Sequence, residues 1–230
     1  MHSHSWDVLA RLSVDPTPDM IAFAEARQAG EPVATPAPSA SVILVRDAAA
    51  GVETYLLHRH ARMPFAASMV VFPGGRVDAA DQAAKSHPVR ACAIRETAEE
   101  TGVRLSDNDL VPWAHWITPE PEPRRYDTQF FLARMPTDQE ARDISGETDR
   151  AEWDTPTAAL AAADRGELAM KPPTRAILLE LAEANSVPQL LAAAGNRVIE
   201  YVQPEVIKTE SGWTIRYPSR LEEGSGESHG

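Results

Sequence analysis

The segment from residue 69 to residue 103 constrains the fold of this chain more than any other stretch. Its first part, MVVFPGG, is an apolar run that predicts a short strand, and its two final glycines predict a loop because glycine adopts backbone angles closed to other residues. Ser86 and Pro88 then show the pattern of a helix start, with a capping hydroxyl and a proline in the first turn, and Gly102 shows that of a stop. The sequence therefore predicts a helix over residues 88–101.

Three glutamates lie on one face of this predicted helix. Residues three and four positions apart share a helical face, so Glu96, Glu99 and Glu100 point the same way. The residues nearly opposite, which we expect to pack on a sheet, are Ala91, Ile94, Ala98 and Thr101. The simplest interpretation is an amphipathic helix whose acidic face is solvated and forms no site.

A bound cation is the alternative explanation for the acidic face. Like charges at these spacings destabilise a helix by roughly 0.2–0.5 kcal/mol per pair, and the helix dipole disfavours anions in the C-terminal half. The preceding strand and its glycines should bring backbone carbonyls close to the carboxylates, and such an all-oxygen set suits Mg²⁺ or Mn²⁺. A hard dication coordinated by the three carboxylates would offset the repulsion between them.

The sequence RETAEETGV, residues 95–103, resembles the core of the Nudix box, in which Arg-Glu is followed by a hydrophobic residue, Glu-Glu and a glycine. FPGG at residues 72–75 matches the start of the same motif, and Thr97 stands in the hydrophobic position. The resemblance implies an α/β (α+β) fold of the Nudix type, an α/β/α sandwich with a mixed central sheet. C-terminal helices and a terminal hairpin are expected in addition.

The spacing of the box departs from the usual pattern. Gly75 lies twenty residues before Arg95, six more than in the usual motif, and the first glutamate of the motif has no clear counterpart. Asp78 and Asp81 are the nearest acids, and either is a candidate for its role. The long box, together with WITPEPEPRRYDTQFFLA and KPPT, resembles the branch that includes the mammalian peroxisomal coenzyme A diphosphatase. A coenzyme A signature is matched only in part, by Leu56, Leu57 and Arg59.

The resemblance implies roles for the box residues. Glu96, Glu99 and Glu100, with the carbonyl of Gly75, would bind Mg²⁺ or Mn²⁺, and one carboxylate could act as general base. Arg95 would hold a box carboxylate in place, a bidentate role that lysine fills poorly. The expected catalytic residues are therefore Arg95, Glu99 and Glu147.

Several candidates lie outside the box helix. Glu147, six residues before Trp153, is preferred over Glu152 as the further acid of the family. Three arginines are candidates for binding substrate phosphate, because an arginine fork matches phosphate oxygens: Arg59, Arg124 and Arg125. Consecutive strand residues face opposite sides, so at most one of the last two should face the site.

The rest of the chain divides by composition. Residues 1–39 are expected to form an arm with weak helical patterns and a Pro-rich linker, residues 40–217 the Nudix domain, and residues 218–230 a disordered tail. Helices are expected over residues 157–164, 174–184 and 188–194. Residues 197–204 and 212–218 are expected to pair as the terminal hairpin. The Ala/Leu-rich helices could pack in the domain or form a homodimer surface.

Charge and hydropathy exclude some classes of function. The net charge is −12 without a Lys/Arg block, so we expect no binding to long nucleic acid. No run approaches the ~20 apolar residues of a membrane span. A single cysteine, Cys92, allows no internal disulfide, and we expect a soluble, cytoplasmic protein.

These observations predict a metal-dependent hydrolase that cleaves the diphosphate of a small nucleoside diphosphate derivative. Coenzyme A or acyl-coenzyme A stands ahead of ADP-ribose, nucleotide sugars and dinucleotides. A catalytically silent Nudix domain that binds a nucleotide as a sensor is the alternative from another class. Such a domain would be expected to have lost an acid, yet all three box glutamates are present.

Overall fold

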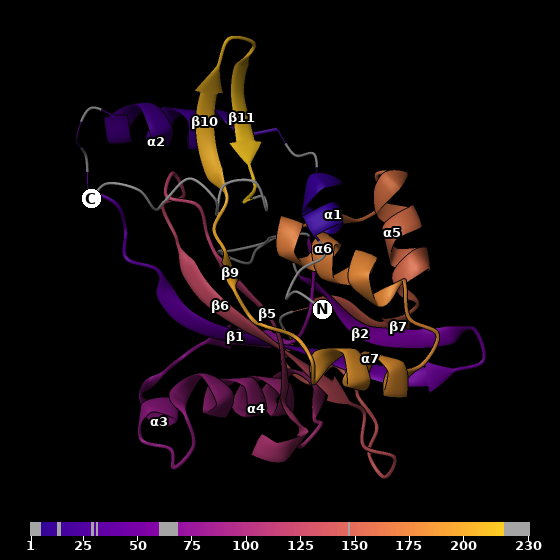
Figure 1. The fold of residues 1–230 in the computed structure, drawn as a ribbon. Helices are drawn as coiled ribbons and strands as arrows, with labels where there is room; N and C mark the ends of the chain where they lie inside the picture. The colour runs from indigo at the N-terminus through magenta and orange to yellow at the C-terminus, as the bar shows by residue number, and fades with distance from the viewer. Residues whose placement is uncertain are drawn as a thin grey trace, which may run out of the picture.

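The computed structural model describes residues 6–12, 15–28, 30, 32–59, 69–146 and 148–218. Within them, a mixed sheet of nine strands lies between helices on both faces (Figure 1). The expected mixed α/β fold with a mixed central sheet is thereby confirmed.

The sheet is centred on the long strand β1 (Ala37–Ala48). The strand order is β8-β3-β2-β1-β6-β5-β9, while β4 also pairs with β1 and β7 with β2. The pairs β1–β6, β3–β8 and β5–β9 are parallel, and the remaining pairs are antiparallel. The other strands are β2 (Gly51–Arg59), β3 (Met69–Val71), β4 (Gly74–Arg76), β5 (Val111–Ile117), β6 (Tyr126–Arg134), β7 (Thr148–Asp154), β8 (Ala169–Met170) and β9 (Tyr201–Val202).

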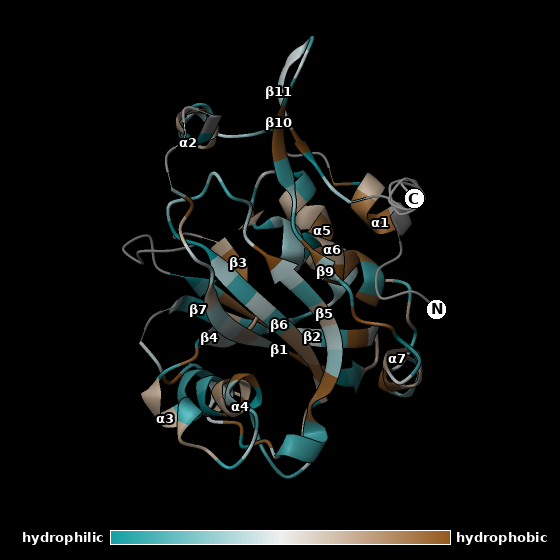
Figure 2. Cartoon of the chain, turned by 60° about the vertical axis from the view of Figure 1, so that its left-hand side comes forward, coloured by the Kyte–Doolittle hydropathy of each residue, from teal (hydrophilic) through white to brown (hydrophobic). Residues whose placement is uncertain are grey.

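Helix α4 (Pro88–Thr101) covers one face of the sheet, next to the short helix α3 (Ala79–Gln82) and the 3₁₀ turn Asp107–Asp109 (Figure 1 and Figure 2). The opposite face packs against α1 (Trp6–Ala10), α5 (Pro156–Asp164), α6 (Pro172–Leu181) and α7 (Val187–Ala194). Helix α2 (Pro18–Gln28) lies beside the strand β10 (Glu205–Thr209).

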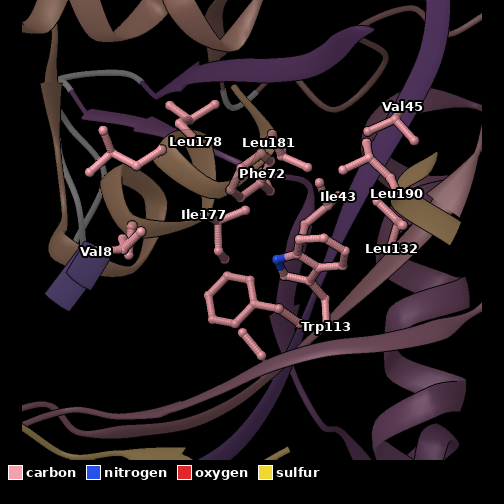
Figure 3. Close-up of a cluster of buried hydrophobic side chains, with 14 of the residues drawn as sticks. Val8, Ile43, Val45, Phe72, Trp113, Leu132, Ile177, Leu178, Leu181 and Leu190 are labelled. Carbon is pink, nitrogen blue, oxygen red and sulfur yellow. The ribbon is translucent and has the colours of Figure 1, made fainter. Parts of the chain in front are cut away.

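Alternation along the strands divides the core in two. In β1, Val42 and Leu44 join the cluster that includes α4, whereas Ile43 and Val45 join the cluster that includes α6. Figure 3 shows Ile43 among Trp113, Ile177 and other side chains of this second cluster. The central strands are therefore apolar on both faces where helices cover them.

Helix α4 has the predicted bounds, residues 88–101, and Gly102 ends it in the left-handed conformation with φ 73°. The predicted cap is wrong. His87, not Ser86, occupies the N-cap position, and no side-chain hydrogen bond caps the helix. Because Pro88 is the first helical residue, Ser86 lies one position too early to cap it.

The predicted terminal hairpin is wrong in its first strand. Residues 201–202 form β9, which adds to the edge of the main sheet beside β5. The hairpin consists of β10 and β11 (Gly212–Arg216), with Thr209 opposite Gly212. The two residues between Thr209 and Gly212 close this hairpin, a local turn that the prediction overlooked.

The N-terminal residues contribute to the core. Val8 and Leu9 of α1 are buried in the cluster that contains α6, and β1 begins at Ala37. The expected division at residues 1–39, 40–217 and 218–230 stays a prediction. Residues 219–230 lie outside the described part of the chain.

No helix among the described residues is long and apolar enough to cross a membrane. The cytoplasmic location and the homodimer stay predictions.

A buried ion pair joins the C-terminal segment to the sheet. Arg197 Nη2 lies 3.0 Å from both carboxylate oxygens of Glu180, and Trp113 Nε1 donates to the same carboxylate at 2.8 Å. The guanidinium also lies 4.1 Å from the centroid of the Trp113 ring. Both charged side chains are at most 8% exposed.

We predict that Arg197→Ala lowers the free energy of unfolding by about 3 kcal/mol, because it leaves the Glu180 charge buried without its cation. Urea denaturation followed by circular dichroism measures the change. Arg165→Ala, which breaks an ion pair with Glu167 on the surface, is the matched control and should leave stability unchanged. Equal effects of the two substitutions would contradict the assignment.

Candidate functional site

Strand β4 pairs with β1 through two glycines, the first of which has a positive φ of 156°. Gly74 is paired with Ser41 and Gly75 with Ala40. A Cβ atom on Gly74 would lie 2.2 Å from the carbonyl oxygen of Ala40, so no other residue fits at this position without displacing backbone.

The second glycine of β4 makes room for a carboxylate of α4. A Cβ atom on Gly75 would lie 2.2 Å from Oε1 of Glu96. One turn further along the helix, Glu100 Oε2 accepts a hydrogen bond from the Gly74 amide at 2.8 Å. Both carboxylates therefore face the two glycines of β4.

This orientation corrects the expected face of the helix. The buried residues of α4 are Val89, Cys92, Ala93, Thr97, Glu100 and Thr101. Of the residues expected to face the sheet, only Thr101 is buried, while Ala91, Ile94 and Ala98 are half-buried. Hydrophobicity alone placed the glutamates in solvent. The two glycines instead leave space, and an amide donor, for carboxylates on the sheet side.

Arg95 links four acidic side chains around the helix. Its Nη1 donates to Glu96 Oε1 and Glu99 Oε2, each at 2.9 Å. Its Nε and Nη2 donate to the two carboxylate oxygens of Asp81 at 3.0 and 2.8 Å, and Nε lies 3.6 Å from Asp78 Oδ2. The hydrogen bond to Asp81, followed by the charge of Glu96, raises the pKa of Arg95 above its ordinary value.

Asp81 is the acid that Arg95 grips in bidentate fashion. Asp78 caps α3 and forms a reciprocal capping box with Asp81, each backbone amide donating to the other's side chain at 2.9 Å. Burial alone would raise the pKa of Asp81, but the hydrogen bonds from Arg95 and from the Asp78 amide hold it below its usual value. The residues inserted in the long box thus include a one-turn helix that presents a carboxylate to Arg95.

The donor set fits a hard dication in chemistry. Burial raises the pKa of Glu96 even though Arg95 and its hydrogen bond oppose this, so a further positive charge would stabilise the carboxylate. The described residues contain no preformed group of three or more His, Cys, Asp or Glu side chains around one metal position. Arg95 Nη1 lies between Glu96 and Glu99, so a metal ion would displace it from these oxygens.

Comparison with known proteins identifies the fold. A model of the NUDIX domain matches residues 35–177, more than half of the chain. The chain belongs to the Nudix family.

Relatives of the chain carry the same family name. A Caenorhabditis elegans protein that is named as nudix hydrolase 7 is 28% identical over 190 residues, which cover 67% of this chain and 63% of that protein. The chain thus spans less than two thirds of the length of this curated relative. A NUDIX hydrolase from Alicyclobacillus acidocaldarius is 24% identical, with a TM-score of 0.62 over 72% of this chain and 98% of that one. A MutT protein from Bacillus halodurans is 18% identical, with a TM-score of 0.50 over 79% and 96%.

The expected family is therefore confirmed, whereas the coenzyme A branch stays a prediction. The solved structures bear on the fold alone.

Of the three candidate arginines, Arg59 lies at the Nudix box. Its Nη1 is 4.0 Å from Glu100 Oε1. Its neighbour His58 faces the other side of the strand, as consecutive strand residues do, and its Nε2 lies 3.1 Å from Glu152 Oε1. A cation therefore stands beside the innermost glutamate of the box.

Arg125 is buried and holds the linker that precedes β1. Its Nε donates to the Thr118 carbonyl at 3.0 Å and its Nη1 to the Ala34 carbonyl at 2.9 Å. Burial lowers the pKa of Arg125. Arg124 is exposed. The geometry thus gives Arg125 a structural task and leaves Arg124 facing solvent.

The predicted further acid, Glu147, lies outside the described residues. Its competitor Glu152 is bonded to His58 and to Arg150. Sequence reasoning missed two contacts of the box, the Gly74 amide and the Cys92 thiol, whose Sγ donates to the Gly75 carbonyl at 3.4 Å. Burial raises the pKa of Cys92 to about 12, so the thiol stays protonated as a donor.

We predict that Asp81→Asn lowers the free energy of unfolding by about 2 kcal/mol, because it removes the charge from two hydrogen bonds to Arg95. Chemical denaturation measures the change. Asp78→Asn is the matched control and should cost little, because asparagine also caps helices. A larger effect at Asp78 than at Asp81 would contradict the assignment.

Proposed function

We propose that the chain is a metal-dependent hydrolase that cleaves the diphosphate linkage of a nucleoside diphosphate derivative. Membership of the Nudix family supports a hydrolase acting on pyrophosphate bonds. One structural observation carries the proposal further. Two glutamates of the box, Glu96 and Glu100, are turned toward Gly75 and Gly74 of β4 rather than into solvent.

The proposed metal ligands are Glu96, Glu99, Glu100 and the carbonyl of Gly75, for Mg²⁺ or Mn²⁺. A dication held there screens the charge of a diphosphate and lowers the pKa of a bound water. The Cys92 thiol donates a hydrogen bond to the Gly75 carbonyl at 3.4 Å. Because every proposed donor is oxygen, the set favours these hard ions.

Arg95 is proposed as a positioning residue, and Asp81 as the counterpart of the first glutamate of the motif. Arg95 spans Asp81 on one side and Glu96 and Glu99 on the other. Asp81 anchors the guanidinium because α3 fixes its carboxylate. If a cation were bound by Glu96 and Glu99, the two hydrogen bonds to Asp81 would still hold the Arg95 guanidinium in place.

Glu99 is proposed as the general base, a role that it would take instead of binding the metal. Its side chain is 59% exposed, compared with 16% for Glu96 and 7% for Glu100, so it is the box carboxylate that an attacking water reaches most easily. Glu99 accepts a proton from the water molecule while the oxygen of that water attacks one phosphorus. The electron pair of the cleaved P–O bond leaves with the other phosphate. Glu147 is the alternative base.

Arg59 is proposed to bind a substrate phosphate, since it lies beside Glu100 and a guanidinium fork matches phosphate oxygens. Arg124 is a second candidate. We propose coenzyme A or acyl-coenzyme A as the first substrates to assay, on the partial signature around Arg59. ADP-ribose, nucleotide sugars and dinucleotides follow.

We predict that the purified protein with Mg²⁺ or Mn²⁺ releases phosphorylated products from at least one compound among coenzyme A, ADP-ribose, NADH and nucleotide sugars. Product release is measured by chromatography. Glu99→Gln and Glu100→Gln should each reduce the rate at least about 100-fold, more than the loss of an outer-shell partner. Glu167→Gln, on the surface, is the control and should be fully active. No turnover of any compound would favour the nucleotide-binding sensor.

A further inference from the structure

A row of residues crosses the sheet from the Nudix box to its far edge. Gly75 of β4 is opposite Ala40 of β1, Ala40 is opposite Gln129 of β6, and Gln129 is opposite His115 of β5. His115 is in turn opposite Tyr201 of β9. The row therefore runs at one level of the sheet from the proposed metal site to an edge strand.

The members of this row share the face that carries α4. Ala40 packs in the α4 cluster, and a Cβ atom on Gly75 would point at Glu96. Phe131 also belongs to this cluster, so by alternation Gln129 and Asp127 project to the same side. The residues in between face the opposite way, where Phe130 is buried in the cluster that contains α6.

Polar and aromatic side chains occupy this face beyond α4. His115 Nε2 lies 2.5 Å from Asp127 Oδ1, and the His115 ring meets the Tyr201 ring edge-on at 6.1 Å. Tyr201 is 61% exposed, and the Asp127 side chain is 41% exposed. We call His115, Asp127, Gln129 and Tyr201 the β5–β6 platform.

No helix is drawn across β5 and β6 in the view of Figure 2, whereas α4 lies lower on the same sheet. The reverse face of these strands is apolar and covered, as Trp113, Trp116 and Leu132 show. A half-exposed polar face is ordinary for an antiparallel sheet. This polar face is continuous with the Nudix box, and for that reason we assign it a ligand.

The distance from the Nudix box to the platform suits one substrate molecule that contacts both. Neighbouring strands lie about 4.8 Å apart, so three steps put His115 about 14 Å from Gly75, and a fourth step reaches Tyr201. A nucleoside diphosphate in an extended conformation has a length of this order. A diphosphate held at the box would therefore direct its nucleoside along the row.

We propose that the β5–β6 platform binds the nucleoside end of the substrate, and this inference rests on the proposed function. The exposed ring of Tyr201 stacks on the aromatic base. The carboxylate of Asp127 accepts hydrogen bonds from ribose hydroxyls or from an exocyclic amine, and the amide of Gln129 both donates and accepts. His115 fixes the Asp127 carboxylate in position.

The test measures binding without chemistry. AMP, GMP, CMP, UMP and ribose 5-phosphate are titrated into the wild type in the presence of EDTA, with isothermal calorimetry as the readout. At least one nucleotide should bind about tenfold more tightly than ribose 5-phosphate, which has no base. Tyr201→Ala and Asp127→Asn should each remove most of this difference.

Phe23→Ala, which removes an exposed aromatic ring on α2, is the matched control for Tyr201→Ala and should bind as the wild type. Glu100→Gln should also keep nucleotide binding, although the proposed function requires it to lose hydrolysis. If the protein binds nucleotide through Tyr201 but hydrolyses no compound, the result would support the platform as a binding site and contradict the proposed hydrolase activity.

Two results would overturn the platform. One is that no nucleotide binds more tightly than ribose 5-phosphate. The other is that Tyr201→Ala and Asp127→Asn, both folded by circular dichroism, bind the preferred nucleotide as the wild type does. In an active enzyme, the two variants should raise KM about tenfold while kcat stays within about twofold, because they act on binding alone.

Discussion

The contact between the two glycines of β4 and the carboxylates of α4 is the constraint on which the site depends. Gly75 leaves the space that the Glu96 carboxylate fills, and the Gly74 amide donates to Glu100. A side chain at Gly75 would collide with Glu96, and one at Gly74 with the backbone of β1, against which Cys92 and Ala93 of α4 are buried. One pair of glycines therefore sets both the packing of α4 and the direction of its acids.

Around this contact, Arg95 holds an arrangement of like charges that would otherwise repel. It bonds Glu96 and Glu99 on the helix and Asp81 from the inserted residues. Arg59 stands against Glu100 from β2. The site thus carries its own cations, and a metal ion would take over oxygens that arginine now satisfies. Gly75 of β4 is also the first residue of the row of paired residues that crosses the sheet to Tyr201.

Sequence patterns correctly predicted the features that depend only on neighbouring residues in the chain. The bounds of α4 and its stop at Gly102 followed from the sequence, because proline and glycine act within one turn. The prediction of which face of α4 packs on the sheet was wrong. The two glycines of β4 decide that face, and the hydrophobicity of the helix does not. The sequence left open whether Asp78 or Asp81 replaces the first glutamate of the box. That Arg95 bonds Asp81 depends on α3 and its capping box, which the sequence did not predict. Arg125 resembled a phosphate ligand in sequence, yet its guanidinium bonds two carbonyls.

The measurement that tests this account most directly is the Mn²⁺ affinity of Gly75→Ala, by isothermal calorimetry. Its new methyl group would collide with Glu96, so we predict an affinity at least about tenfold below that of the wild type, with Glu96→Gln showing the same loss. Gly195→Ala meets only ordinary contacts, at 3.7 Å or more, and should bind Mn²⁺ normally. A folded Gly75→Ala protein with wild-type affinity for Mn²⁺ would contradict the central claim.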